Sequence, residues 1–152
     1  MKTEIDYLIS FRDNMVKFLD ELIEQFPHEA SFILIRIFVK DKIPITAVLG
    51  RFMMECLPYK KYIKDRDDTF FLNSDMILNK YAEDAGLDRI DRFREMWTND
   101  KMLDTDDKQV IWDWFDLFFN IAINYYKKFG PVDEWEFDLE KSIKRFENTN
   151  KN

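Results

Sequence analysis

The scarcity of helix-breaking residues is the feature of this chain that most constrains its fold. The 152 residues include only three glycines and four prolines. Average usage of about 7% Gly and 5% Pro would give roughly 18 such residues in a chain of this length. Sheets joined by tight turns need these residues at the turns. The shortage therefore argues against a many-stranded sandwich and favours long helices joined by short polar connections.

Large aromatic side chains are abundant in the same chain, with 15 Phe, 6 Tyr and 4 Trp. Apolar residues make up 46% of the sequence, and a domain of this length buries about 70% of the surface that its unfolded chain exposes. The chain can therefore form one hydrophobic core. We therefore predict an all-α fold, a single-domain helical bundle of about six to seven helices. The domain is predicted to cover residues 1–147, with 148–152 as a flexible C-terminal end.

The first helix is predicted to begin after Thr3 and to end before Pro27. Thr3 can accept a hydrogen bond from the first helical turn, and Pro27 disfavours helical geometry at the residue before it. Between them, apolar residues recur every three or four positions, which is typical of a helix with one buried side. These positions are Leu8, Phe11, Met15, Phe18 and Leu22.

The most apolar segment of the chain covers residues 105–129. Asp104 or Thr105 can cap its start, and Gly130 ends it. Because most of its surface is apolar, we predict a central helix near 105–129. A further amphipathic helix within 132–146 is predicted to pack across it.

Residues 28–42 are ambiguous, because they are rich in Ile, Phe and Val, which favour strands. A strand would place Ile33, Ile35 and Ile37 on one face, but the chain contains no second run of this type to pair with it. A helix is therefore favoured without excluding a strand. Such a helix would be apolar on all sides, which predicts a central position.

Three other helices are indicated by their boundaries. One is predicted to run from Pro44 to Leu57, where Pro58 stops it. Two shorter helices are predicted, one over about 75–84 after the cap residue Ser74 and one from the cap residue Asp88 through Trp97. The segment 59–72, which lies between the first of these helices and the two shorter ones, is predicted to be irregular or a short helix.

The charge of the chain disfavours a nucleic-acid partner. Asp and Glu number 30 against 23 Lys and Arg, for a formal net charge of −7, which repels a phosphate backbone. One local segment opposes this trend by combining basic and aromatic residues. It consists of Tyr59, Lys60, Lys61, Tyr62, Lys64 and Arg66. Three aspartates beside it largely cancel its charge, and nucleic-acid binding through this segment is kept as an alternative function.

Cysteine and histidine usage is minimal. Cys56 is the only cysteine and His28 the only histidine, so the chain forms no intrachain disulfide and has few ligands for zinc. A single cysteine in an apolar stretch is predicted to be a small buried hydrophobe in a protein of a reducing intracellular compartment. The chain also has no glycine-rich phosphate loop. We predict no catalytic, metal-binding or cofactor-binding residue and no cofactor.

Membrane insertion and secretion are not expected from the sequence. The longest uncharged stretch, Leu117 to Tyr126, is about half of what a membrane-spanning helix needs. The first ten residues include Glu4 and Asp6 before any apolar run, which does not resemble a secretory signal.

Polar residues on the 105–129 helix have two interpretations. Asp113, Asp116, Asn120 and Asn124 recur at helical spacing and share one face. Exposure to solvent is the favoured interpretation. The alternative is a buried polar groove in a small-ligand-binding or enzymatic bundle.

Three tryptophans are candidate partner-binding residues, because each stands beside polar residues and tryptophan is enriched where proteins bind each other. They are Trp97, Trp112 and Trp135. With no catalytic motif, the favoured function is a non-enzymatic protein-protein interaction or assembly protein. Its partner would be another protein or a second copy of the chain.

Four segments, taken together in their order, carry a resemblance to a known set of proteins. They are residues 26–29, residues 36–41 with 43–45, residues 66–72, and residues 106–115. The chain resembles short uncharacterised proteins encoded by large nucleocytoplasmic DNA viruses of algae and amoebae, over roughly residues 18 to 129. The resemblance implies a viral factor or virion component, located in the host cytoplasm or the virion. It assigns no role to any single residue.

Overall fold

The computed structural model describes residues 2–73, 77–87 and 92–130, and these are helical without any strand. The predicted all-α fold is confirmed, and six of the described α-helices have seven residues or more. The helix predicted within 132–146 lies outside the described residues. The elements are α1 (Glu4–Gln25), α2 (Ala30–Ile37), the π-helical turn η1 (Phe38–Lys42), α3 (Ile45–Cys56), the 3-10 turn η2 (Leu57–Tyr59), α4 (Lys60–Lys64), α5 (Thr69–Asn73), α6 (Ile77–Asp84), α7 (Arg92–Thr98) and α8 (Thr105–Phe129).

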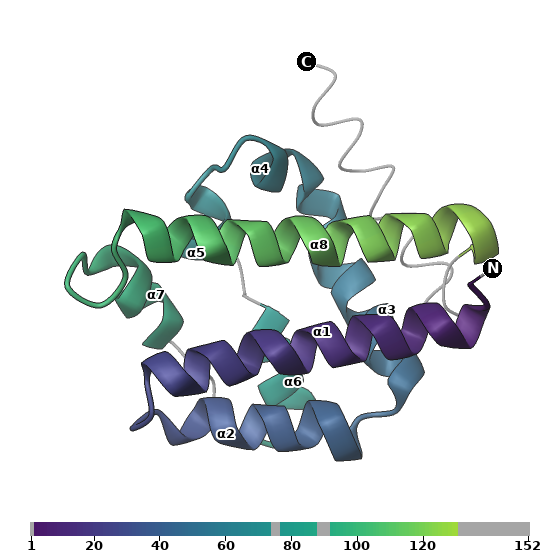
Figure 1. Cartoon of the computed structure of the whole chain (residues 1–152), viewed down its shortest axis with the longest axis horizontal. Coiled ribbons are helices and arrows are strands. Elements are labelled where there is room, and N and C mark those ends of the chain that lie inside the picture. The colour runs from purple at the N-terminus through teal and green to yellow at the C-terminus, as the bar shows by residue number, and fades with distance from the viewer. Residues whose placement is uncertain (1, 74–76, 88–91, 131–152) are drawn as a thin grey trace.

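The two longest helices, α1 and α8, define the arrangement. Figure 1 shows them side by side, with α2 on the opposite side of α1 from α8 and α3 behind them. Helix α1 contacts α2, α3 and α8, and α3 also contacts α6. The core therefore forms where α1, α3 and α8 meet, and α2 is attached to its edge.

Both long helices begin with reciprocal hydrogen bonds between side chain and backbone. The Asp6 N–H donates to Thr3 Oγ1 at 3.3 Å, and the Thr3 N–H donates to Asp6 Oδ2 at 2.9 Å. These bonds hold the pKa of the Asp6 carboxyl below its usual value. Asp104 and Asp107 form the same pair of bonds at 2.8 and 3.0 Å. The helix starts predicted from these residues are confirmed, because capping depends only on neighbours in the chain.

Phenylalanine rings from three helices form the centre of the core. The ring centroid of Phe11 in α1 lies 5.0 Å from that of Phe52 in α3 and 5.5 Å from that of Phe118 in α8. The Phe52 and Phe118 rings are 5.9 Å apart and close to perpendicular. Edge-to-face contacts of this kind add to the free energy gained from burial. The 105–129 helix thus supplies the centre of the core from its inner face.

A second aromatic group connects the shorter helices to α8. The Phe71 ring of α5 lies 4.2 Å from the Trp97 ring of α7 and 4.7 Å from the Trp112 ring of α8. Phe115 joins the two groups, since its ring lies 5.2 Å from Phe71 and 5.9 Å from Phe18 in α1. The two aromatic groups therefore form one continuous core.

Helix α2 does not occupy the central position predicted from its composition. Only Phe32 and Ile35 of this helix are buried. Ile33, Leu34 and Ile37 are 40%, 42% and 40% exposed. The prediction of a helix over this segment is confirmed and that of a central position is wrong, because the aromatic rings of α1, α3 and α8 already fill the interior.

Truncation of Phe118 tests this account of the core. Because its ring contacts α1 and α3 at once, Phe118→Ala is expected to lower the free energy of unfolding by about 3 to 5 kcal/mol. Asn120→Ala, on the exposed face of the same helix, should change it by less than about 0.5 kcal/mol. Urea titration followed by circular dichroism measures both. Equal effects of the two substitutions would contradict the assignment of Phe118 to the core.

Candidate interaction surface

The structure places two of the predicted partner-binding tryptophans inside the core. Trp97 is 1% exposed and Trp112 is 4% exposed, and their rings pack against each other at 5.5 Å. Trp135 lies outside the described residues. Neither Trp97 nor Trp112 presents its ring to a partner, so the assignment is corrected at these two positions. Trp114, which is not among the predicted partner-binding tryptophans, is half-buried and donates from its indole N–H to Glu21 Oε2 at 2.6 Å.

The basic and aromatic segment forms η2, α4 and the turn after it. Lys60, Lys61 and Lys64 are exposed, as is Tyr59. Tyr62 is half-buried, and its ring lies 5.9 Å from the Tyr59 ring. The lysines of this segment therefore face solvent together on one short helix.

Arg66, the last residue of that segment, makes its contacts with α8. Its backbone is left-handed, with φ 54°. Its Nη2 lies 3.0 Å from Asp113 Oδ1 and 2.8 Å from Asp116 Oδ2, and its guanidinium lies 5.9 Å from the Trp112 ring. With two carboxylates beside it, Arg66 is not available to a nucleic-acid phosphate.

The polar residues of α8 face solvent. The side chains of Asp113 and Asp116 are 62% and 45% exposed, and Asn120 and Asn124 are exposed as well. The favoured interpretation of this stripe is confirmed. These residues do not line a buried polar groove, so we do not assign a ligand site to them.

Cys56 of α3 and Tyr81 of α6 are both buried in the core. Tyr81 Oη donates to the carbonyl oxygen of Val48 at 2.6 Å. Burial raises the pKa of the Cys56 thiol well above its usual value of 9.0, and that of the Tyr81 phenol well above 10.0. Cys56 is 1% exposed, so the prediction of a small buried hydrophobe is confirmed. A thiol held protonated and out of solvent is a poor nucleophile.

The raised pKa values predict a loss of stability at alkaline pH. Both groups stay protonated in the folded protein, whereas the unfolded chain releases these protons near pH 9.0 and 10.0. The free energy of unfolding should therefore be unaffected by these groups below about pH 8 and should fall as the pH rises through 9 to 11. Tyr81→Phe should make this fall smaller, and Tyr59→Phe, at an exposed tyrosine, should not. Urea titrations between pH 7 and pH 11 give the slopes, and identical slopes for Tyr81→Phe and the unaltered protein would contradict the prediction.

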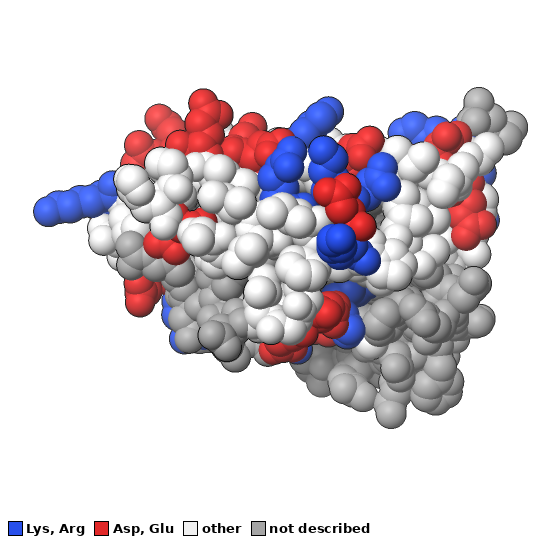
Figure 2. All heavy atoms as spheres, turned by 90° about the horizontal axis from the view of Figure 1, so that it is seen from below, with Lys and Arg blue, Asp and Glu red and all other residues white. Residues whose placement is uncertain are grey.

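The outer side of α2 carries an apolar surface at helical spacing. Ala30, Ile33, Leu34 and Ile37, at relative positions i, i+3, i+4 and i+7, are all exposed, and we call them the α2 apolar face. This spacing is the one by which a helix packs against another element. Among the described residues, no other helix exposes three large aliphatic side chains within two turns. Figure 2 shows the molecule from this side: an uncharged area lies left of the centre, and a band of Lys, Arg, Asp and Glu side chains crosses the middle of the view.

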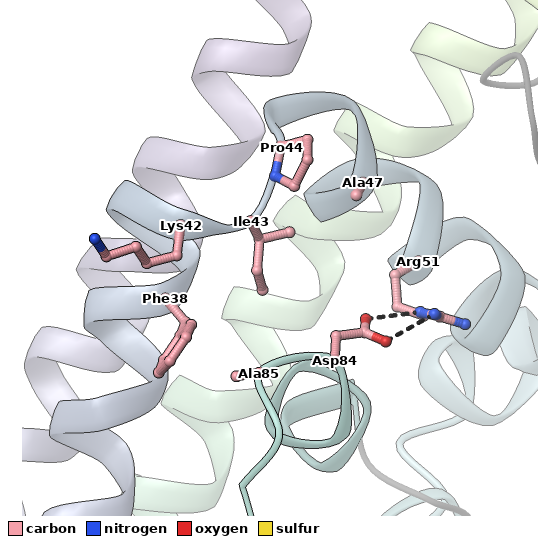
Figure 3. Close-up of a pocket in the computed structure, with 8 residues that line it drawn as sticks. All are labelled: Phe38, Lys42, Ile43, Pro44, Ala47, Arg51, Asp84 and Ala85. Carbon is pink, nitrogen blue, oxygen red and sulfur yellow. Dashed lines mark hydrogen bonds and ion pairs between the residues drawn. The ribbon is translucent and has the colours of Figure 1, made fainter.

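A pocket adjoins the α2 apolar face on the side toward α6. Leu34 and Phe38 are four residues apart and lie on the same side of the helix, and Phe38 lines the pocket. Its volume is about 340 Å³. Arg51 and Asp84 close one wall with two hydrogen bonds of 2.8 and 3.0 Å (Figure 3). The pocket is lined by Phe38, Lys42, Ile43, Pro44, Ala47, Arg51, Asp84 and Ala85.

The π-helical turn η1 shapes this pocket. It extends α2 by one wide turn, and the Ile43 N–H donates to the Phe38 carbonyl oxygen at 2.7 Å. Turns of this kind are rare and frequently occur at functional sites. On the opposite side of α2, Arg36 forms an ion pair with Asp20 of α1. The α2 apolar face is thus bordered by a charged pair on one side and by the pocket on the other.

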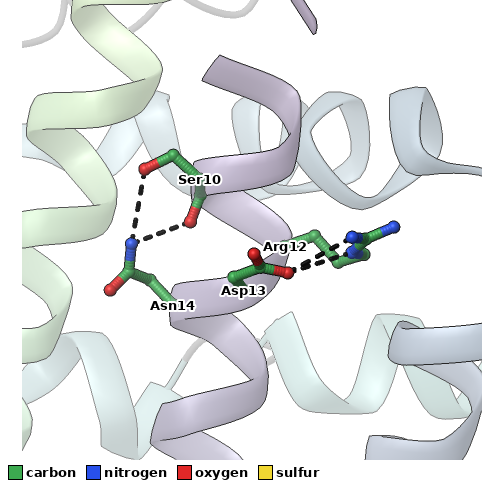
Figure 4. Close-up of polar contacts among 4 residues, drawn as sticks. All are labelled: Ser10, Arg12, Asp13 and Asn14. Carbon is green, nitrogen blue, oxygen red and sulfur yellow. Dashed lines mark hydrogen bonds and ion pairs between the residues drawn. The ribbon is translucent and has the colours of Figure 1, made fainter. Parts of the chain in front are cut away.

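A second groove lies between α1 and η1, with a volume of about 410 Å³. Its walls carry both charges, since Arg12, Lys17 and Lys40 face it together with Asp13 and Asp41. The Arg12 guanidinium contacts the neighbouring Asp13 at 3.3 Å (Figure 4), an exposed contact that contributes little. The same figure shows Asn14 donating to the Ser10 carbonyl oxygen of its own helix at 2.7 Å. Because positive and negative side chains both line this groove, it has little preference for an anionic over a cationic ligand.

The described residues include no group of three His, Cys, Asp or Glu side chains that could hold a metal ion. Within the same ranges, the longest helices are too polar or too short to cross a membrane. No protein-family model matches this chain, and searches of curated proteins and of solved structures found no significant match. The α2 apolar face and its adjoining pocket are therefore identified as a candidate site from their geometry alone.

Sequence reasoning missed Ile33, Leu34 and Ile37 as candidate site residues. A signal was present, because Pro27 and Pro44 limit this segment to a short helix, and such a helix can bury one side against α1 while its other side stays outside. The apolar composition alone did not show which side of the helix would stay exposed.

Proposed function

We propose that this protein is a non-enzymatic protein-interaction or assembly factor that binds its partner through the α2 apolar face. Ile33, Leu34 and Ile37, each about two-fifths exposed, support this proposal most strongly. Removing apolar surface from water is the main driving force of association, at about 25 cal/mol per Å². The pocket beside Phe38 offers a place for a side chain of the partner, and such pockets frequently hold the residues that contribute most to binding.

The resemblance of four segments to proteins of large DNA viruses supports a viral setting for this function. We propose that the chain acts as a viral factor or virion component, in the host cytoplasm or in the particle. A single, buried cysteine is compatible with the reducing intracellular compartment that this setting implies.

Substitution of the α2 apolar face tests the proposed function. The tagged full-length chain should retain a stoichiometric partner from extracts of the cells that produce it. Ile33→Lys combined with Ile37→Lys should lower the retained amount at least about tenfold, because two charges would have to be desolvated in the contact. Both side chains are partly exposed, so we expect the urea midpoint to change little.

Val110→Lys is the matched control, since Val110 is an exposed aliphatic residue on α8. It should leave the retained amount unchanged. If the Ile33 and Ile37 variant retains its partner as well as the control does, the α2 apolar face is not the binding surface.

The exposed lysines of α4 favour nucleic-acid association as a second candidate function. Lys60, Lys61 and Lys64 face solvent beside the exposed ring of Tyr59, a combination that suits a phosphate backbone and stacked bases. The prediction is a mobility shift of single-stranded nucleic acid at low salt. Changing the three lysines to Glu should abolish it, whereas the same change at Lys17, Lys101 and Lys127, which are also exposed, should only weaken it. Absence of any shift at low salt would exclude this function.

A further inference from the structure

We infer that the partner on the α2 apolar face is a second copy of this chain, with the two α2 helices packed antiparallel about a two-fold axis. The inference rests on the proposed function and specifies the partner. It follows from the pattern of apolar side chains on α2 and from the charges at the two ends of the helix.

The apolar pattern is self-complementary in an antiparallel pair. A two-fold axis through the middle of α2 places Ile33 and Leu34 at the same level along the helix as Leu34 and Ile33 of the second copy. The same axis places the small side chain of Ala30 opposite Ile37 of the second copy, where a small residue accommodates a large one. Two-fold interfaces require this property, because the same surface is used on both sides.

The charges at the ends of α2 select the antiparallel direction. Glu29 stands just before the helix and Lys40 just after it. They are separated by about three helical turns and so lie on the same side of the α2 apolar face. In the antiparallel pair each Glu29 approaches Lys40 of the second copy, whereas a parallel pair would place like charges at the same end of the contact and leave Glu29 and Lys40 apart. A carboxylate accepts several hydrogen bonds at once, so this contact is compatible with others that Glu29 makes.

The size of the surface predicts a reversible dimer. Helix α2 has eight residues and therefore a length of about 12 Å. Stable dimers bury about 800 Å² on each partner, which a single short helix does not provide without the rim of the adjoining pocket. Each copy also carries a net charge of −7, which opposes association. We expect a dissociation constant on the order of 100 µM.

Sedimentation equilibrium of the full-length chain between about 5 µM and about 500 µM tests the dimer. The weight-average mass should rise from 18.6 kDa toward twice that value. Ile37→Glu should keep it at the monomer mass throughout, and Val110→Glu should behave like the unaltered chain. The urea midpoints of these variants show whether each remains folded.

A charge exchange tests the antiparallel direction. Glu29→Lys and Lys40→Glu should each raise the dissociation constant at least about tenfold, because each variant sets like charges opposite each other at both ends of the contact. An equimolar mixture of the two variants restores opposite charges at both ends. Its dissociation constant should return to within about threefold of that of the unaltered chain.

Each outcome separates this inference from the proposed function. A chain that stays monomeric at about 500 µM, while Ile33→Lys with Ile37→Lys still loses a heterologous partner, overturns self-association and leaves the proposed function standing. A dimer that neither Ile37→Glu nor the charge exchange weakens overturns the inference, because the contact then lies elsewhere. A dimer that weakens with Ile37→Glu and is indifferent to Glu29→Lys overturns the antiparallel arrangement.

Discussion

The contacts of Phe115 and Phe118 are the interactions on which the rest of the structure depends. Phe118 connects α1 and α3 to α8, and Phe115 connects this group to Phe71 of α5. Each ring buries a large apolar surface and packs against others in tilted or edge-to-face geometry. Through these two residues one helix organises both the long helices and the short ones. Short helices such as α5 and α7 are marginal in isolation, so their stability in this protein depends on these tertiary contacts.

The filling of the interior by aromatic rings has a consequence for the surface. Trp97 and Trp112, which as isolated residues would be good anchors for a partner, are part of the core. The aliphatic residues of α2 lie outside instead, since α1 accepts only the side that carries Phe32 and Ile35. The same competition for interior space thus removes the predicted partner-binding residues and leaves Ile33, Leu34 and Ile37 exposed. The candidate site is therefore a result of core packing. Its exposed aliphatic side chains are the kind that contact with another apolar surface stabilises.

The predictions that succeeded depended on neighbours in the chain. Thr3 and Asp104 begin the two long helices through contacts three residues away, and Gly130 ends α8 with φ 80°, a conformation that glycine adopts readily. The predictions that failed needed distant partners. The burial of Trp97 depends on Phe71, and the orientation of Arg66 depends on Asp113, 47 residues along the chain. The side of α2 that faces α1 depends on the shape of the core, which no local pattern of Ile, Leu and Phe encodes.

The sequence by itself determined that this protein is a helical bundle and where its main helices begin and end, because helix periodicity, capping and breaking are effects of residues within a few positions of one another. Tertiary structure alone decided which apolar residues became interior and which became surface. The physical reason is that the interior has a limited volume and is close-packed: once the rings of Phe11, Phe52 and Phe118 occupy it, a short apolar helix at the edge keeps one side exposed. That side, the α2 apolar face, is where we expect this protein to bind its partner.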